Sequence, residues 1–206
     1  MIDIHCLSTP VLTVWNMPLS WGDLSGFATG VLCVWLTVRA HIWNFPTGIA
    51  NSLILGVVFL DQRLFSDASL QVLFIMLGVQ GWIQWHRGKV GEEAKPVTRM
   101  DLREWIGLAL GTLVVWFLLW RLMLWAKGAA PPIDALITAL SLSAQWLLNC
   151  KRLENWWWWI AVDLVSVPLY WVRGLPLISL LYLVFLAMCV AGWVQWNRVL
   201  PARSPA

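Results

Sequence analysis

Four polar side chains recur on one side of an otherwise apolar stretch, residues 133–150. Spacings of three, four and four residues place them on one face of a helix. They are Thr138, Ser141, Gln145 and Asn149. Such a face either lines a hydrated or ligand-lined path or joins neighbouring helices by hydrogen bonds. Helix packing is the simpler explanation for Thr138 and Ser141, whereas both interpretations stay open for Gln145 and Asn149.

A second candidate face follows in residues 156–172, where one acid accompanies a run of four tryptophans. Spacings of three, four and three residues put Trp156, Trp159, Asp163 and Ser166 on one side of a helix. Indole rings and a carboxylate suit a flat cationic ligand, through stacking, cation–π attraction and charge pairing. The alternative is a buried acid that satisfies a neighbouring Asn, Gln or Tyr. The other two tryptophans, Trp157 and Trp158, are expected to anchor a span at the membrane interface.

Other polar side chains offer weaker binding candidates. Asn51 and Gln80 are the deeper polar residues of the apolar stretches 45–61 and 67–86. The Tyr182 hydroxyl could meet a ligand or simply a neighbouring side chain. The sequence has no phosphate-binding P-loop, no G-x-S-x-G elbow, no H-E-x-x-H motif and no C-x-x-C pair. We therefore expect a binding protein and not an enzyme, with no catalytic residues, no metal site and no cofactor.

Composition assigns these faces to a membrane protein. Of the 206 residues 60% are hydrophobic and only 12% are charged, which is too little polar surface to coat a soluble domain. A membrane-spanning helix needs about 20 mainly apolar residues. Seven such stretches predict an all-α integral membrane protein, at residues 21–42, 45–61, 67–86, 103–125, 133–150, 156–172 and 175–196.

An internal repeat groups the seven spans. The run GWIQWHR at Gly81–Arg87 returns as GWVQWNR at Gly192–Arg198, 111 residues later. The same offset, without a gap, pairs Asp23 with Asp134, Trp35 with Trp146, Asn44 with Asn155 and Phe74 with Phe185. We expect an N-terminal segment at 1–20, one three-helix repeat at 21–87, a loop and linker helix at 88–130, a second repeat at 131–198, and a tail at 199–206.

The basic residues predict the orientation. Ten of the fourteen Lys and Arg residues follow the first, third, fifth and seventh spans, which places those span ends in the cytoplasm and the N-terminus outside. The two repeats then run in parallel, and the fourth span is the linker that permits it. Transporters built from parallel repeats bind substrate near the bilayer midplane, between the repeats. A membrane scaffold whose tryptophan-rich helices bind partners is the competing hypothesis.

The second repeat resembles the PnuC family of vitamin transporters. The resemblance rests on the run 144–148, on Lys151, and on the sequence of residues Leu153-Glu154-Asn155-Trp156, Trp159, Asp163, Leu169-Tyr170, Arg173-Gly174-Leu175, Leu181-Tyr182, Gly192 and Trp196. The first repeat matches more loosely, through Asn44, Gly48, Asn51, Asp67, Gly81-Trp82 and Trp85. Together these residues extend over positions 20–198.

The resemblance implies a relative of the SWEET sugar-transporter architecture. It also implies energy-independent uptake of nicotinamide riboside across the inner membrane, trapping of the substrate by cytosolic phosphorylation, and a homotrimer without a nucleic-acid partner. Other vitamins, such as thiamine or riboflavin, are the alternative substrates. The substrate's pyridinium would meet Trp156, Trp159 and Asp163. Its ribose and carboxamide would meet Gln145, Asn149, Asn51, Gln80 and Tyr182.

Overall fold

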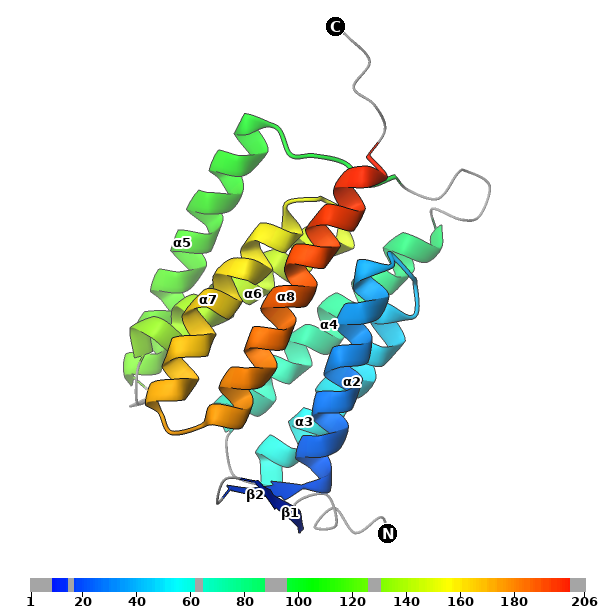
Figure 1. The fold of residues 1–206 in the computed structure, drawn as a ribbon. Helices are drawn as coiled ribbons and strands as arrows, with labels where there is room; N and C mark the ends of the chain where they lie inside the picture. Colours follow the sequence, from blue (N-terminus) through cyan, green and yellow to red (C-terminus); the bar gives the residue numbers. More distant parts are fainter. Residues whose placement is uncertain (1–8, 15–16, 62–64, 88–95, 126–130, 201–206) are drawn as a thin grey trace, which may run out of the picture. The chain divides into compact units, whose positions relative to one another are not determined.

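The computed structural model describes residues 9–14, 17–61, 65–87, 96–125 and 131–200. Its elements are two short strands followed by long helices (Figure 1). They are β1 (Pro10–Val14), β2 (Met17–Ser20), α2 (Trp21–Val38), α3 (Asn44–Asp61), α4 (Phe65–Arg87), α5 (Leu102–Trp125), α6 (Pro131–Asn149), α7 (Asn155–Val172) and α8 (Pro176–Arg198).

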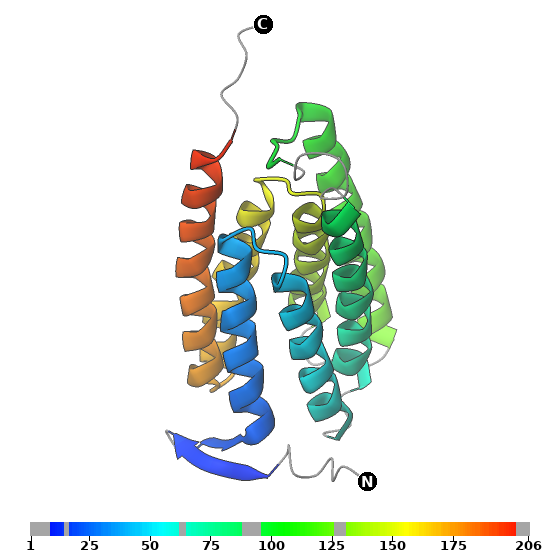
Figure 2. The ribbon, with the colours of Figure 1, turned by 90° about the vertical axis from the view of Figure 1, so that its right-hand side faces the viewer.

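These helices confirm the all-α membrane fold expected from hydropathy. Each of the seven expected spans coincides with a helix among the described residues. Four of the helices, α2, α3, α5 and α8, are long and apolar enough by themselves to cross a bilayer. The N-terminal segment adds a detail that hydropathy did not predict, because β1 and β2 pair as an antiparallel hairpin that leads directly into α2 (Figure 2).

The chain divides into two compact units, Met1–His86 and Arg87–Ala206. The first unit holds the hairpin, α2, α3 and α4. The second holds α5 together with α6, α7 and α8, and α5 packs along α6. The arrangement of two repeats around a separate linker helix therefore stays a prediction, since the linker helix belongs structurally to the second unit.

Local sequence signals explain how the first unit begins. Ser20 caps α2, and its hydroxyl accepts a hydrogen bond from the Asp23 backbone N–H while the Asp23 carboxylate accepts one from the Ser20 N–H. Helices α2 and α3 run side by side in opposite directions (Figures 1 and 2). Gly26 allows this approach, because a Cβ there would lie 2.9 Å from Leu55 of α3. Asp23 therefore completes a capping box at the start of α2.

The helix-to-helix turn shows the internal repeat in three dimensions. Ala40 and Lys151, 111 residues apart, both adopt positive φ, at 49° and 52°. Few non-glycine residues do so. Asn44 and Asn155 then each donate a hydrogen bond from Nδ2 to the carbonyl oxygen three residues back, at 2.7 and 2.6 Å. The duplication thus preserves the backbone geometry of this turn as well as its residue types.

An aromatic pair follows the turn in each unit. Phe45 meets Trp85 edge to face with centroids 5.0 Å apart, and Trp156 meets Trp196 in the same way at 5.5 Å. Trp85 and Trp196 are only 3% and 0% exposed. Tryptophans near the ends of spans commonly anchor a protein at the membrane interface. These two do not, because their rings fill the contact between two helices of one unit.

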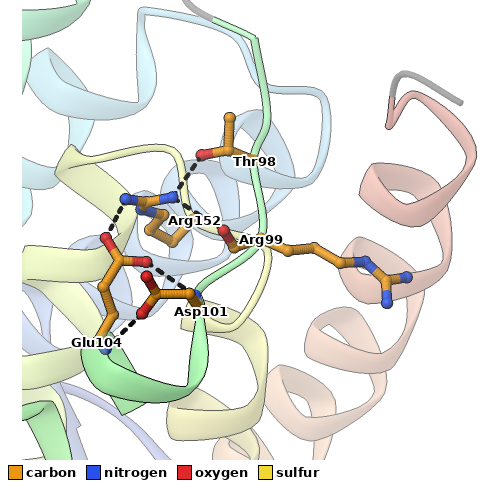
Figure 3. Close-up of polar contacts among 5 residues, drawn as sticks. All are labelled: Thr98, Arg99, Asp101, Glu104 and Arg152. Atoms are coloured by element: carbon orange, nitrogen blue, oxygen red, sulfur yellow. Dashed lines mark hydrogen bonds and ion pairs between the residues drawn. The ribbon is translucent and has the colours of Figure 1, made fainter. Parts of the chain in front are cut away.

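A polar cluster attaches the segment before α5 to the turn between α6 and α7 (Figure 3). Arg152 in that turn pairs with Glu104 and donates hydrogen bonds to the Thr98 hydroxyl and the Arg99 carbonyl oxygen. Asp101 caps α5 by accepting from the Glu104 backbone N–H at 2.7 Å. One guanidinium thus joins the segment at the start of α5 to the α6–α7 turn at three points.

Replacing Arg152 with Ala should lower the stability of the second unit by about 1 kcal/mol, since the lost hydrogen bonds lie in a partly exposed site. The measurement is thermal unfolding of the purified protein in detergent. Arg103→Ala is the matched control, because Arg103 is an exposed arginine in the first turn of α5, next to Glu104. Equal melting of the two variants would contradict this role of Arg152.

Further contacts continue along α5. The Thr112 and Ser143 hydroxyls hydrogen-bond at 2.7 Å, and Trp116 donates from Nε1 to the Pro132 carbonyl oxygen. Trp158 stacks on Trp105 with centroids 6.3 Å apart. Trp158 is therefore a buried packing residue and not the interfacial anchor we expected. Its neighbour Trp157 is 48% exposed, which agrees with the expected anchor.

Candidate functional site

Helices α7 and α8 pack antiparallel in a regular register (Figure 1). Side chains seven residues apart on α7 meet side chains seven residues apart on α8, so that the contacts form three layers. The layers are Trp156 with Trp196, Asp163 with Cys189, and Tyr170 with Tyr182. A polar layer is thus enclosed between two aromatic layers, one heptad to either side.

The middle layer contains a carboxylate in an apolar setting. Asp163 is 2% exposed, and the Cys189 thiol donates a weak hydrogen bond to its Oδ2 at 3.5 Å. Among the described residues no Lys, Arg or His forms an ion pair with it. Burying a carboxylate without a cation costs several kcal/mol. An acid kept here therefore indicates a functional role more than a structural one.

The upper aromatic layer is close-packed. Trp156 is almost fully buried, and its ring lies so near Gly192 that a Cβ at that position would approach to 2.4 Å. The first unit carries Phe45 and Gly81 at the equivalent positions. The close contact with Gly192, together with the pairing to Trp196 that Phe45 and Trp85 repeat in the first unit, gives Trp156 a packing function.

Trp159 lies on a different side of α7. It packs against a cluster that contains Met100, Ala144, Leu147 and Trp158. Helix α7 contacts both α6 and α8, so the face that we expected to be continuous is divided between two neighbours. The structure therefore separates Trp159 from the layer of Trp156.

The lower aromatic layer brings Tyr182 into the site. Its ring stacks on Tyr170 with centroids 5.3 Å apart, at an interplanar angle of 14°. Its hydroxyl lies within interaction range of Asp163 and Ser166. Tyr182 thus stands beside the buried acid, as expected for a residue of one site.

The polar pair on α6 is partly self-satisfied. Gln145 donates from Nε2 to Asn149 Oδ1 at 3.1 Å, and Asn149 is buried whereas Gln145 is half-buried. The two amide side chains form one hydrogen-bonded pair near the C-terminal end of α6. The contact agrees with the predicted common face of α6.

The two first-unit candidates differ from each other. Asn51 is half-buried and accepts a hydrogen bond from the Thr29 hydroxyl at 2.8 Å. Gln80 is exposed, on the same side of α4 as the exposed apolar residues Val72, Met76 and Val79. The structure therefore places Asn51 between helices and Gln80 on an apolar outer face of its unit.

Sequence reasoning missed Cys189 and Tyr170. Both stand at the seven-residue spacings 156, 163, 170 and 182, 189, 196. That spacing is visible in the sequence, but it has meaning only once α7 and α8 are known to pack against each other in this register.

Comparison with known proteins decides the family. The family model described as "Nicotinamide mononucleotide transporter" matches residues 20–198, nearly the whole chain. The chain belongs to this family. Its similarity to PnuC proteins, expected from the second repeat, is confirmed by curated relatives and by a solved structure.

The relatives that this chain resembles include two kinds of named transporter. The nicotinamide riboside transporter PnuC of Escherichia coli K12 is 26% identical, over 86% of this chain and 85% of that protein. The riboflavin/roseoflavin transporter RibM of Streptomyces davaonensis is 25% identical, over 94% and 92%. A crystal structure of the vitamin B3 transporter PnuC shares the fold, with a TM-score of 0.72 at 22% identity, over 87% of this chain and 81% of that one.

Proposed function

We propose that this protein mediates facilitated, energy-independent uptake of nicotinamide riboside by alternating access, and that cytosolic phosphorylation traps the substrate. The observation that carries this proposal is the buried Asp163, which has no cationic partner among the described residues and is enclosed by aromatic layers. Nicotinamide riboside carries a flat pyridinium cation. The relatives named as nicotinamide riboside transporters support the same substrate.

Electrostatics favours a cation in this setting. A carboxylate shielded from water attracts a positive charge more strongly than one at the surface, because the effective dielectric constant is lower. The positive charge of the proposed substrate would offset the free-energy cost of desolvating Asp163, and the surrounding polar groups would hold the substrate. The proposed binding residues are Gln145, Asn149, Trp156, Trp159, Asp163, Tyr182, Asn51 and Gln80.

A flux measurement tests the proposal. Purified protein in liposomes should pass labelled nicotinamide riboside without ATP or a proton gradient. A negative interior should speed entry, since about 2.3 kcal/mol acts on one charge per 100 mV. Folded protein that carries no flux would refute the proposal, and flux that ignores an imposed potential would indicate a compensating ion.

Riboflavin is the second candidate substrate, because RibM matches this chain over a larger share of both proteins than the Escherichia coli PnuC does. Riboflavin is uncharged, so a buried carboxylate gains less from it. A binding titration that compares nicotinamide riboside, thiamine and riboflavin separates the candidates. Tightest binding of riboflavin would replace the first proposal with the second, and binding of none would favour a scaffold.

The remaining features of the proposal concern the assembly. We propose a homotrimer in the inner membrane, with the N-terminus outside and the C-terminus in the cytoplasm. Light scattering of the purified protein measures the oligomer. To test the orientation, cysteines are introduced near either terminus and labelled in intact cells with a reagent that does not cross the membrane.

A further inference from the structure

Ser166 is a buried polar residue of α7 whose hydroxyl group is unsatisfied within the described part of the chain. It is 0% exposed, and its hydroxyl oxygen has no hydrogen-bond partner among the described residues. An unsatisfied buried hydroxyl costs about 1–3 kcal/mol. Most buried polar atoms in proteins are paired, so an exception requires an explanation.

Other helical hydroxyls in this chain show how easily that cost is avoided. A Ser or Thr in a helix can donate to the carbonyl oxygen four residues back. Among the described residues, the hydroxyls of Ser25, Thr29, Thr37, Thr47 and Thr112 do so at 2.7–2.9 Å. Ser166 has the same option and does not use it. Its hydroxyl can therefore form a hydrogen bond with another group, such as a ligand.

The surroundings of Ser166 define what it could bind. It stands three residues after Asp163, so the two side chains are neighbours on one face of α7. Its hydroxyl lies within interaction range of the Tyr182 hydroxyl, but its oxygen forms no hydrogen bond of normal geometry with the described residues. A carboxylate, two hydroxyls and the Cys189 thiol therefore gather in one layer.

The internal repeat shows that this layer is specific to the second unit. The residues at the equivalent positions of the first unit are Ser52 for Asp163 and Leu55 for Ser166. The aromatic pair and the turn are kept in both units, whereas the polar pair is not. A feature required only for folding of the repeat would appear in both.

A sugar hydroxyl fits this pair best. Asp163 can only accept a hydrogen bond, while Ser166 can both donate and accept. A ligand hydroxyl can donate to the carboxylate and accept from Ser166 at the same time. A pyridinium ring has no N–H or O–H of its own, so the ring alone would satisfy neither residue by hydrogen bonding.

We infer that Ser166 is a specificity-determining residue that hydrogen-bonds a ribose hydroxyl of the substrate beside Asp163. The inference rests on the proposed function and adds the sugar to it. A carboxylate next to the glycosidic bond accepts from the sugar and still lies near the pyridinium charge. Both ribosyl and ribityl groups carry such hydroxyls, which agrees with the named relatives of this chain, transporters of nicotinamide riboside and of riboflavin.

The test is a binding titration with nicotinamide riboside and its 2′-deoxy and 3′-deoxy analogues. Ser166→Ala should weaken binding of nicotinamide riboside about tenfold, the loss expected for one hydrogen bond. One analogue should bind the wild type about tenfold more weakly than nicotinamide riboside does. That same analogue should bind Ser166→Ala as well as it binds the wild type, because the bond is already absent.

Ser179→Ala is the matched control. Ser179 is a buried serine of α8 whose hydroxyl donates to the Val167 carbonyl oxygen at 2.8 Å, so its replacement should leave the affinity within about twofold. Ser166→Cys is the second variant. It keeps the shape with a weaker donor and should bind between wild type and Ser166→Ala, which preserves the test if the alanine variant fails to fold.

Two results would overturn the inference. One is unchanged affinity of folded Ser166→Ala for nicotinamide riboside. The other is a deoxy penalty in Ser166→Ala as large as in the wild type for both analogues, which would make Ser166 a packing residue. Failure of the proposed function looks different, because folded wild-type protein would then not bind nicotinamide riboside, and the assignment of Ser166 would fall with it.

Discussion

Replacing Asp163 with Asn is expected to weaken binding of nicotinamide riboside by about 10- to 100-fold. A hydrogen bond or close contact to a charged group contributes about 1.5–3 kcal/mol, and each 1.4 kcal/mol is tenfold in affinity. The amide keeps the shape of the side chain, removes the charge and replaces one acceptor oxygen with an NH2 donor. Titration of the purified variant measures the affinity, and liposome flux measures transport.

The thermal stability of Asp163→Asn should not fall with its affinity for the ligand. Because Asp163 is buried without an ion pair among the described residues, neutralising it removes a desolvation cost, so Asp163→Asn should melt at the same or a higher temperature. Asp134→Asn is the control, since Asp134 pairs at 2.9 Å with Arg173 in a partly exposed site. Unchanged affinity of Asp163→Asn would remove this acid from the binding site.

Gly192→Ala should produce the largest loss of stability of the variants considered. Its Cβ would stand 2.4 Å from the Trp156 ring, which is itself enclosed by Trp196. Overpacking of this kind costs about 1–3 kcal/mol and sometimes more. Thermal unfolding in detergent, and the fraction of protein that elutes as a single folded species, measure the effect.

Two further variants make the Gly192 prediction specific. Gly111→Ala on α5 meets nothing within 4 Å and should be neutral, or stabilising by about 0.5–1 kcal/mol through helix propensity. Adding Trp156→Phe to Gly192→Ala should recover part of the loss, because the smaller ring leaves room for the methyl group. A Gly192→Ala protein as stable as Gly111→Ala would contradict the packing seen here.

Hydropathy alone predicted the helices well. All seven stretches became helices with ends within a few residues, because a bilayer sets a minimum length for an apolar segment and charged residues mark the breaks. The internal repeat predicted equivalent local structure, which the turns at Ala40 and Lys151 confirm. The attachment of α5 to the second unit was not predictable, since it depends on side chains far apart in sequence, Arg152 and Glu104.

The sequence predicted what kind of site the protein holds. It predicted less well which residues lie together in that site. Asp163 stood out because acids inside spans are rare. Trp156 and Trp159 were grouped by helical spacing, yet a helix with neighbours on two sides divides such a face between them. Trp158 was misinterpreted as an interfacial anchor for a related reason. Tryptophan is common both at the membrane interface and in helix contacts, and residue type does not distinguish the two.

The asparagine-closed turn of each unit has a consequence for biogenesis. Its hydrogen bonds span only three residues, from Asn44 and Asn155 to the carbonyl oxygens just before them. Contacts so close in sequence form early, and chains emerge from the ribosome N-terminus first. The α2–α3 hairpin can therefore be complete in the membrane while α7 is still being synthesised, and each later hairpin can assemble on its own without waiting for the rest of the chain.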